Sequence, residues 1–161
     1  MDSLIRLLCE NVQPPPGRKG WAGGPTADGA VRGVTARQAH WAPAPGRHSI
    51  WALTLHIAYW KYAVRRRLGG GSGERFPRSP ANWPRVPDRA DGKAWAADVA
   101  LLRAEGARLL DAIKRVPRAA LSRSLPPSRR WTRAEMILGI AQHDAYHTGQ
   151  IQLLKRLQGI R

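Results

Sequence analysis

Cysteine is almost missing from this sequence, which has Cys9 as its single example in 161 residues. A lone cysteine excludes an intramolecular disulfide, and it excludes a zinc site built from several cysteines unless two chains share it. Such cysteine usage suits a reducing compartment, so we expect a cytoplasmic protein.

Glutamate is scarce as well, and occurs at Glu10, Glu74, Glu105 and Glu135. A ferritin-like di-iron site needs several glutamates, including Glu-x-x-His pairs. None of the four glutamates precedes a histidine by three positions, which excludes this class of metal site.

Long apolar runs and strand patterns are also missing. The sequence has no run of about 18 apolar residues, so we expect no membrane-spanning helix. Its first residues lack a basic flank before an apolar core, so we expect no signal peptide. No long alternating run rich in Val, Ile, Thr and Tyr is present, which favours an all-α fold. The length and the 43% hydrophobic content fit a single domain over residues 1–161.

Acidic residues are few, and the 27 Lys and Arg residues against 11 Asp and Glu give a net charge of +16. This excess raises nucleic acid or an anionic surface as a partner. However, the only tight basic cluster is Arg65, Arg66 and Arg67, and no nucleic-acid-binding motif accompanies the charge. We therefore expect a solvated basic surface, with nucleic acid as the less favoured partner.

Helical periodicity, by contrast, is frequent. It predicts a short first helix from about Ser3 to Asn11, with Leu4, Leu7 and Leu8 facing inward. Residues 12–34 are rich in glycine and proline and are expected to form a loop, with a helical turn near residues 28–32.

Three long helices are predicted to follow, from about Ser49 to Leu68, from Asp91 to Val116 and from Thr132 to Leu157. Thr132 and Glu135 form a capping box for the last of them. The long proline-rich loop at residues 69–91 is of a kind that often covers or builds a functional site. Three long helices and a short one predict a four-helix bundle.

The inward stripe of the last helix is interrupted midway by polar residues. His147 lies near the centre of the stripe, and His143 and Asp144 lie on its two shoulders. Burying such groups costs free energy unless they find partners. His143 and His147 are four residues apart, so both imidazoles could reach one metal ion. Alone, this pair is more often a pair of hydrogen-bonded core or exposed histidines than a metal site.

His56 supplies a third imidazole from the middle of the second long helix. Alone, it would be read as a hydrogen-bonded core histidine. With the other pair, it predicts one divalent metal ion, Zn, Ni or Fe, on His56, His143 and His147, in the arrangement of a catalytic site with an open position. Trp60, one turn later, either lines the pocket or belongs to the core.

Asp144 has two interpretations. It could be a general base for a bound water or thiol, and hence a catalytic residue, or an acceptor that orients an imidazole N–H, which we favour. His40 and His48 are expected to lie outside the site.

The two histidine segments, from Arg47 to Trp60 and from Ile137 to Ile151, resemble the DinB-like superfamily of metal-dependent four-helix-bundle proteins. The resemblance covers nearly the whole chain, and it implies an up-down-down-up topology with a metal held by His56, His143 and His147. It further implies a homodimer and a small-molecule substrate. Characterised relatives include transferases that use low-molecular-weight bacterial thiols, such as bacillithiol or mycothiol, and a maleylpyruvate isomerase.

One departure from the family pattern concerns the loop after the first helix. Many relatives carry Trp-His-Gly there, whereas this chain has Trp21-Ala22-Gly23. If that histidine takes part in the chemistry, Ala22 puts catalysis in doubt and leaves the metal site intact. Three hypotheses follow: a thiol transferase or hydrolase, a non-catalytic bundle that binds a metal or small ligand, and a basic nucleic-acid-binding module.

Overall fold

The computed structural model describes residues 1–15, 17–18, 23–69, 73–125 and 130–160. These residues form an all-helical fold whose α-helices are α1 (Ser3–Val12), α2 (Ala27–Val31), α3 (Ala36–His40), α4 (Ile50–Arg67), α5 (Gly92–Lys114) and α6 (Arg133–Leu157). A 3₁₀ turn, η1 (Arg118–Ala120), precedes α6. Within the described residues, no helix is both long and apolar enough to cross a membrane.

Side-chain caps explain where the long helices begin. The Ser49 hydroxyl accepts a hydrogen bond from the Ala52 N–H, and the Asp91 carboxylate accepts one from the Ala94 N–H. The capping box predicted at the start of α6 is confirmed. The expected bounds of all three long helices therefore agree with the structure to within two residues.

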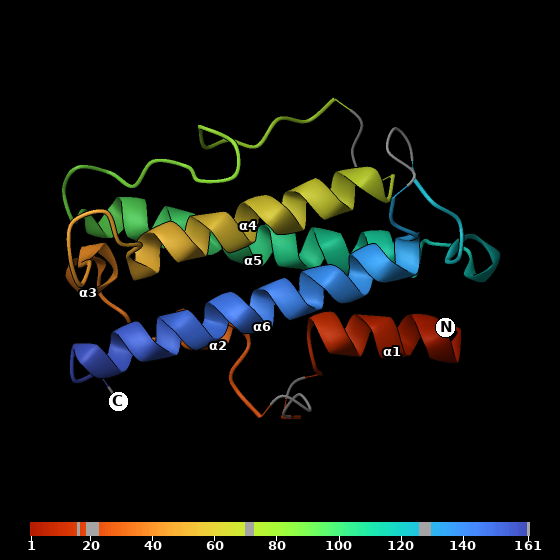
Figure 1. Cartoon of the computed structure of the whole chain (residues 1–161), viewed down its shortest axis with the longest axis horizontal. Coiled ribbons are helices and arrows are strands. Elements are labelled where there is room, and N and C mark those ends of the chain that lie inside the picture. Colours follow the sequence, from red (N-terminus) through yellow and green to blue (C-terminus); the bar gives the residue numbers. More distant parts are fainter. Residues whose placement is uncertain (16, 19–22, 70–72, 126–129, 161) are drawn as a thin grey trace.

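The four main helices have the up-down-down-up topology of a bundle (Figure 1). In that view α1 and α6 run in one direction, whereas α4 and α5 both run in the other. Because α4 and α5 are parallel neighbours, the segment that connects them must run back along the whole bundle. Residues 73–91 do so as an extended segment over α4. This return explains the length of the proline-rich loop.

The apolar core is divided into two clusters along the bundle. One contains the N-terminal half of α4, the C-terminal end of α6, and α2 and α3. The other contains the C-terminal end of α4, the N-terminal half of α6, and α1. A polar belt of buried residues lies at their junction: Lys61, Arg65, Glu105, Asp144, His147 and Thr148. The polar interruption expected on the last helix thus extends across three helices.

The expected inward face of the first helix is wrong in part. Leu8 is buried, but Leu4 is 38% exposed and Leu7 is 55% exposed. The buried face instead follows Ile5, Leu8, Cys9 and Val12, a spacing of three and four residues that keeps one side of a helix against the core. Leu4 and Leu7 precede that stripe by one position and therefore lie on the flank of the helix.

Candidate metal centre

The structure brings His56 of α4 together with His143 and His147 of α6. One ring nitrogen from each histidine can be chosen such that all three lie within 4.8 Å of one another. His56 and His147 are buried, whereas the side chain of His143 is 24% exposed. The three histidines that the sequence singles out therefore lie together in the structure, and one of them borders solvent.

Each of the two buried histidines commits its Nδ1 atom to an oxygen acceptor. His56 Nδ1 lies 2.6 Å from the Asn82 carbonyl oxygen, and His147 Nδ1 lies 2.7 Å from Gln150 Oε1. Nδ1 then carries the proton, because a carbonyl oxygen can only accept. Nε2 of both rings is left as a lone-pair donor, which is how proteins orient imidazoles that ligate metals.

The third histidine completes the group through its own Nε2 atom. His143 Nε2 lies 3.0 Å from His56 Nε2. The donor set consists of imidazole nitrogens alone, which suits Zn, Ni or Fe and disfavours Mg and Ca. The residues present therefore fit the divalent ion that the sequence predicts.

The long loop supplies the cover of the centre. Asn82 has a φ of 69°, a left-handed conformation that asparagine tolerates better than most residues. This turn directs its carbonyl oxygen to His56, while its side-chain oxygen accepts a hydrogen bond from Trp60 Nε1 at 2.8 Å. The next residue, Trp83, stacks on the His56 ring at 3.7 Å between centroids.

Trp60 borders the centre, as the sequence allowed. Its ring centroid lies 5.9 Å from that of His143 and 6.4 Å from that of His56. The two remaining histidines lie outside the group of three. His48 stacks on the opposite face of Trp83, at 3.7 Å, and His40 Nε2 lies 2.9 Å from the Pro87 carbonyl oxygen.

Asp144 lies next to the centre but turns its carboxylate across the bundle. One oxygen forms an ion pair with Lys61, and the other lies 3.7 Å from His143 Nδ1. Sequence analysis missed Lys61, Asn82, Trp83 and Gln150. Only Gln150 had a local signal, since it follows His147 by three residues on the same helix. Ala22, the departure from the family pattern, lies outside the described residues.

The comparison with known families agrees with this geometry. The sequence model of the DinB superfamily matches residues 25–151, most of the chain, including all three histidines. The chain belongs to the DinB superfamily. No curated protein and no solved structure gives a significant match. In this DinB protein the argument for a metal centre therefore rests on the geometry of the three histidines.

Burial favours the neutral form of two of the three histidines, His56 and His147, by lowering their pKa values. It lowers the pKa of His56 to about 4, although the Asn82 carbonyl raises it, and the neighbouring His147 and His143 lower it further. Burial also lowers the pKa of His147, against the hydrogen bond to Gln150. Neutral imidazoles are the form that binds a metal ion, so the site is prepared for the ion at neutral pH.

These pKa values predict a loss of stability in mild acid. Unfolded His56 has an ordinary pKa of 6.5, so between pH 6.5 and about 4 the unfolded chain binds more protons than the folded one. The free energy of unfolding of the metal-free protein should therefore fall as the pH drops through this range, by about 3 kcal/mol for the His56 shift. His147 should add to the loss in the same direction.

Urea denaturation at pH 7, 6 and 5 measures the larger part of this loss, at pH values where most carboxylates are still ionised. His56→Gln is the matched variant, because it cannot take up the proton, and its stability should change less with pH. An equal loss in wild type and His56→Gln would contradict the prediction.

Proposed function

We propose that this protein is a metal-dependent enzyme, a thiol-dependent S-transferase or a hydrolase, that acts on a small molecule. It would hold one divalent ion, Zn, Ni or Fe, on His56, His143 and His147. The observation that carries the proposal is the set of hydrogen bonds at Nδ1 of His56 and His147, which leaves a lone pair on the Nε2 atom of both rings, close to His143. When bound, such an ion acts as a Lewis acid that makes water or a thiol a better nucleophile near neutral pH.

The surrounding residues determine how reactants would approach. Trp83 covers the flat face of His56, and the loop that carries it closes this side of the centre. His143 is the exposed ligand, and Trp60 stands beside it, half-buried. Reactants would therefore arrive past His143 and Trp60, where an indole face offers apolar contact to an electrophile or to the carbon chain of a thiol.

The test is turnover with defined metals. Purified protein is stripped with a chelator, reloaded with Zn²⁺, Ni²⁺ or Fe²⁺, and incubated with low-molecular-weight thiols together with chlorinated, epoxide or ester substrates. We expect thiol adducts or hydrolysis products that depend on metal and disappear again with chelator. A protein that binds metal but shows no metal-dependent product over this panel would contradict the enzymatic proposal.

A non-catalytic metal- or ligand-binding bundle is the second candidate. The stack of His48, Trp83 and His56 supports it, because these rings leave little room on one side of the centre. It predicts metal binding of ordinary affinity without turnover. The reloading experiment therefore separates the two candidates.

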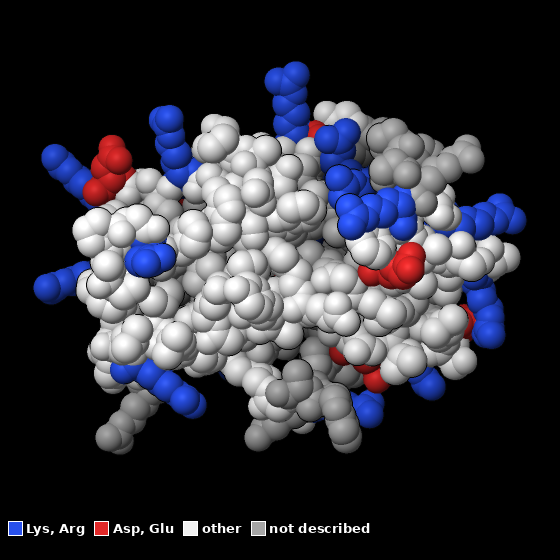
Figure 2. Space-filling model, in the orientation of Figure 1, with Lys and Arg blue, Asp and Glu red and all other residues white. Residues whose placement is uncertain are grey.

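The remaining expectations concern partners and location. The exposed side of α6 carries large apolar residues, Leu138, Tyr146, Leu153 and Leu157, which supports the proposed homodimer. Figure 2 shows most Lys and Arg side chains scattered around the margin of one face, one group of them inside its upper right part, and few charges at its centre. Scattered cations of this kind favour a solvated basic surface over a nucleic-acid site. The lone cysteine continues to favour a cytoplasmic location.

A further inference from the structure

Asp144 lies between a metal-site histidine and a buried lysine. Its Oδ2 atom forms an ion pair with Lys61 Nζ, and the two side chains are only 9% and 6% exposed. Its other oxygen, Oδ1, is buried without a hydrogen-bond partner, and so is His143 Nδ1. These two atoms lie 3.7 Å apart. Two buried polar atoms that lie this close without forming a hydrogen bond are unusual, since each unpaired group costs free energy.

The positions of the protons on the imidazole rings explain why Asp144 Oδ1 and His143 Nδ1 do not form a hydrogen bond. His56 carries its proton on Nδ1, so its Nε2 can only accept. At 3.0 Å, His143 Nε2 is placed to donate to that atom. The proton of His143 then sits on Nε2, and its Nδ1 presents a lone pair to the carboxylate oxygen. Two acceptors repel each other, which accounts for their separation.

Metal ligation requires the other tautomer of His143. Its Nε2 must offer a lone pair to the ion, so the proton must sit on Nδ1. In that tautomer Nδ1–H has Asp144 Oδ1 beside it, 3.7 Å from the nitrogen, and a shift of a few tenths of an ångström would complete the hydrogen bond. Nδ1 of His56 and of His147 already faces an oxygen. Asp144 would supply the corresponding oxygen for the third histidine, His143.

We infer that Asp144, held by Lys61, is a positioning residue that fixes the Nδ1–H tautomer and the ring orientation of His143 for metal binding. The inference rests on the proposed metal centre and concerns how that centre is built. Lys61 matters because it holds Oδ2, which keeps the carboxylate from rotating and leaves Oδ1 toward the histidine.

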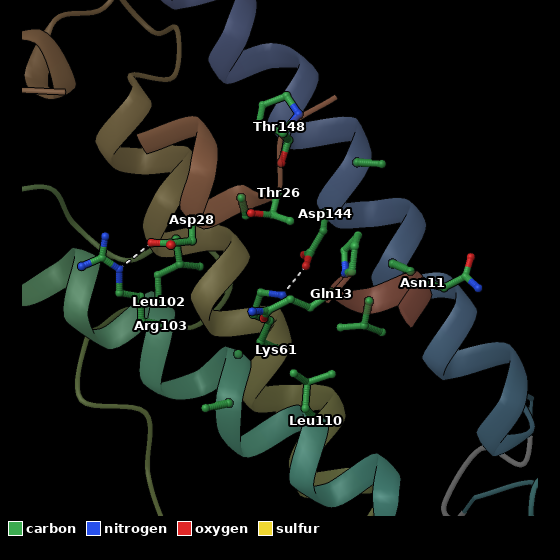
Figure 3. Close-up of a pocket in the computed structure, with 18 of the residues that line it drawn as sticks. Asn11, Gln13, Thr26, Asp28, Lys61, Leu102, Arg103, Leu110, Asp144 and Thr148 are labelled. Carbon is green, nitrogen blue, oxygen red and sulfur yellow. Dashed lines mark hydrogen bonds and ion pairs between the residues drawn. The ribbon is translucent and has the colours of Figure 1, made fainter. Parts of the chain in front are cut away.

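The pocket on the far side of Asp144 supports a role that acts through His143. A cavity of about 220 Å³ lies between α1, α2, α5 and α6, and Lys61 and Asp144 form part of its wall (Figure 3). None of the three histidines lines it among the described residues. Within it, Asp144 Oδ2 is bound to Lys61 and Oδ1 is buried toward His143. Neither oxygen is therefore free to act on a molecule in this cavity.

Asp144→Asn tests the inference, because an amide has one oxygen in place of two. If that oxygen accepts from Lys61, the amide N–H₂ faces His143 Nδ1 and favours the wrong tautomer. We expect the affinity for Zn²⁺, measured by competition with a chromophoric chelator, to fall by about 10- to 100-fold. The matched control is Asp98→Asn, a buried carboxylate that pairs with Trp51 and Arg78. It should keep the wild-type affinity even if it loses stability.

A second measurement needs no variant. In Zn²⁺-loaded wild-type protein with ¹⁵N-labelled histidine, nitrogen chemical shifts identify the protonated atom of each ring by NMR. We expect Nδ1 of His143 to be protonated and Nε2 to be coordinated. A third measurement returns to the variants: the visible absorption of the Co²⁺-loaded protein should change in Asp144→Asn but not in Asp98→Asn. Coordination through Nδ1, or wild-type Zn²⁺ affinity in Asp144→Asn, would overturn the inference and leave the metal centre standing. A wild-type protein that binds no Zn²⁺ would overturn both.

Discussion

His143→Ala should fold and lose its metal. The substitution removes one of three ligands at a partly exposed position, so the apolar core is little disturbed. Loss of a ligand should cost more than loss of a residue that only supports one, for which a decrease of about 10- to 100-fold is typical. We therefore expect the affinity for Zn²⁺ to fall by more than about 100-fold, and metal-dependent turnover to disappear with it.

His56→Ala should show the same loss of metal, and His40→Ala provides the matched control. His40 is a half-buried histidine, bound to the Pro87 carbonyl and in edge contact with Trp51, and it lies outside the group of three. Metal per chain is measured by elemental analysis after purification and again after reloading. Equal metal in wild type, His56→Ala and His143→Ala would show that the proposed site is wrong.

Glu105→Ala should strongly lower the free energy of unfolding. Glu105 is 1% exposed and binds Arg65 Nε at 2.9 Å, and Arg65 itself is 4% exposed. Removing one partner of a buried ion pair typically costs about 3–5 kcal/mol, because the other charge is left in the core. Glu74 still binds Arg65 at 2.7 Å, so we expect about 3 kcal/mol, the low end of that range.

Urea denaturation at pH 7 measures this loss. Replacing both partners, Arg65→Met with Glu105→Leu, should recover most of the stability, since no buried charge then remains unpaired. Asp111→Ala breaks the exposed pair with Lys114 and should change stability by less than about 1 kcal/mol. If Glu105→Ala were no worse than Asp111→Ala, the polar belt would not contribute as described.

Much of the fold could be predicted because its signals are local. A capping threonine followed by a glutamate three residues later predicts the start of α6, and this pattern can be recognised without the rest of the chain. The same is true of the spacing between His143 and His147. For α1 the local signal was ambiguous: several apolar residues are adjacent, and only packing decides that Ile5 faces inward while Leu4 does not.

The surroundings of the histidines could not be predicted because they depend on contacts distant in sequence. Asn82 and Trp83 lie in a proline-rich loop, and their approach to His56 follows from the return of the chain between two parallel helices. Lys61 would ordinarily be read as a solvated residue. Its burial is tolerated because Asp144 of another helix forms an ion pair with it, and this pairing cannot be seen in the sequence.

The division of the core gives the metal centre a mechanical consequence. Between the two apolar clusters, α4 and α6 are joined at the polar belt by an ion pair and by facing imidazoles. An ion on the three histidines would link these helices near the junction of the two apolar clusters. Its binding free energy would then add to that of folding. Binding and release of metal would thus strengthen and weaken the contact between α4 and α6 in the middle of the bundle. The packing of each apolar end would stay the same.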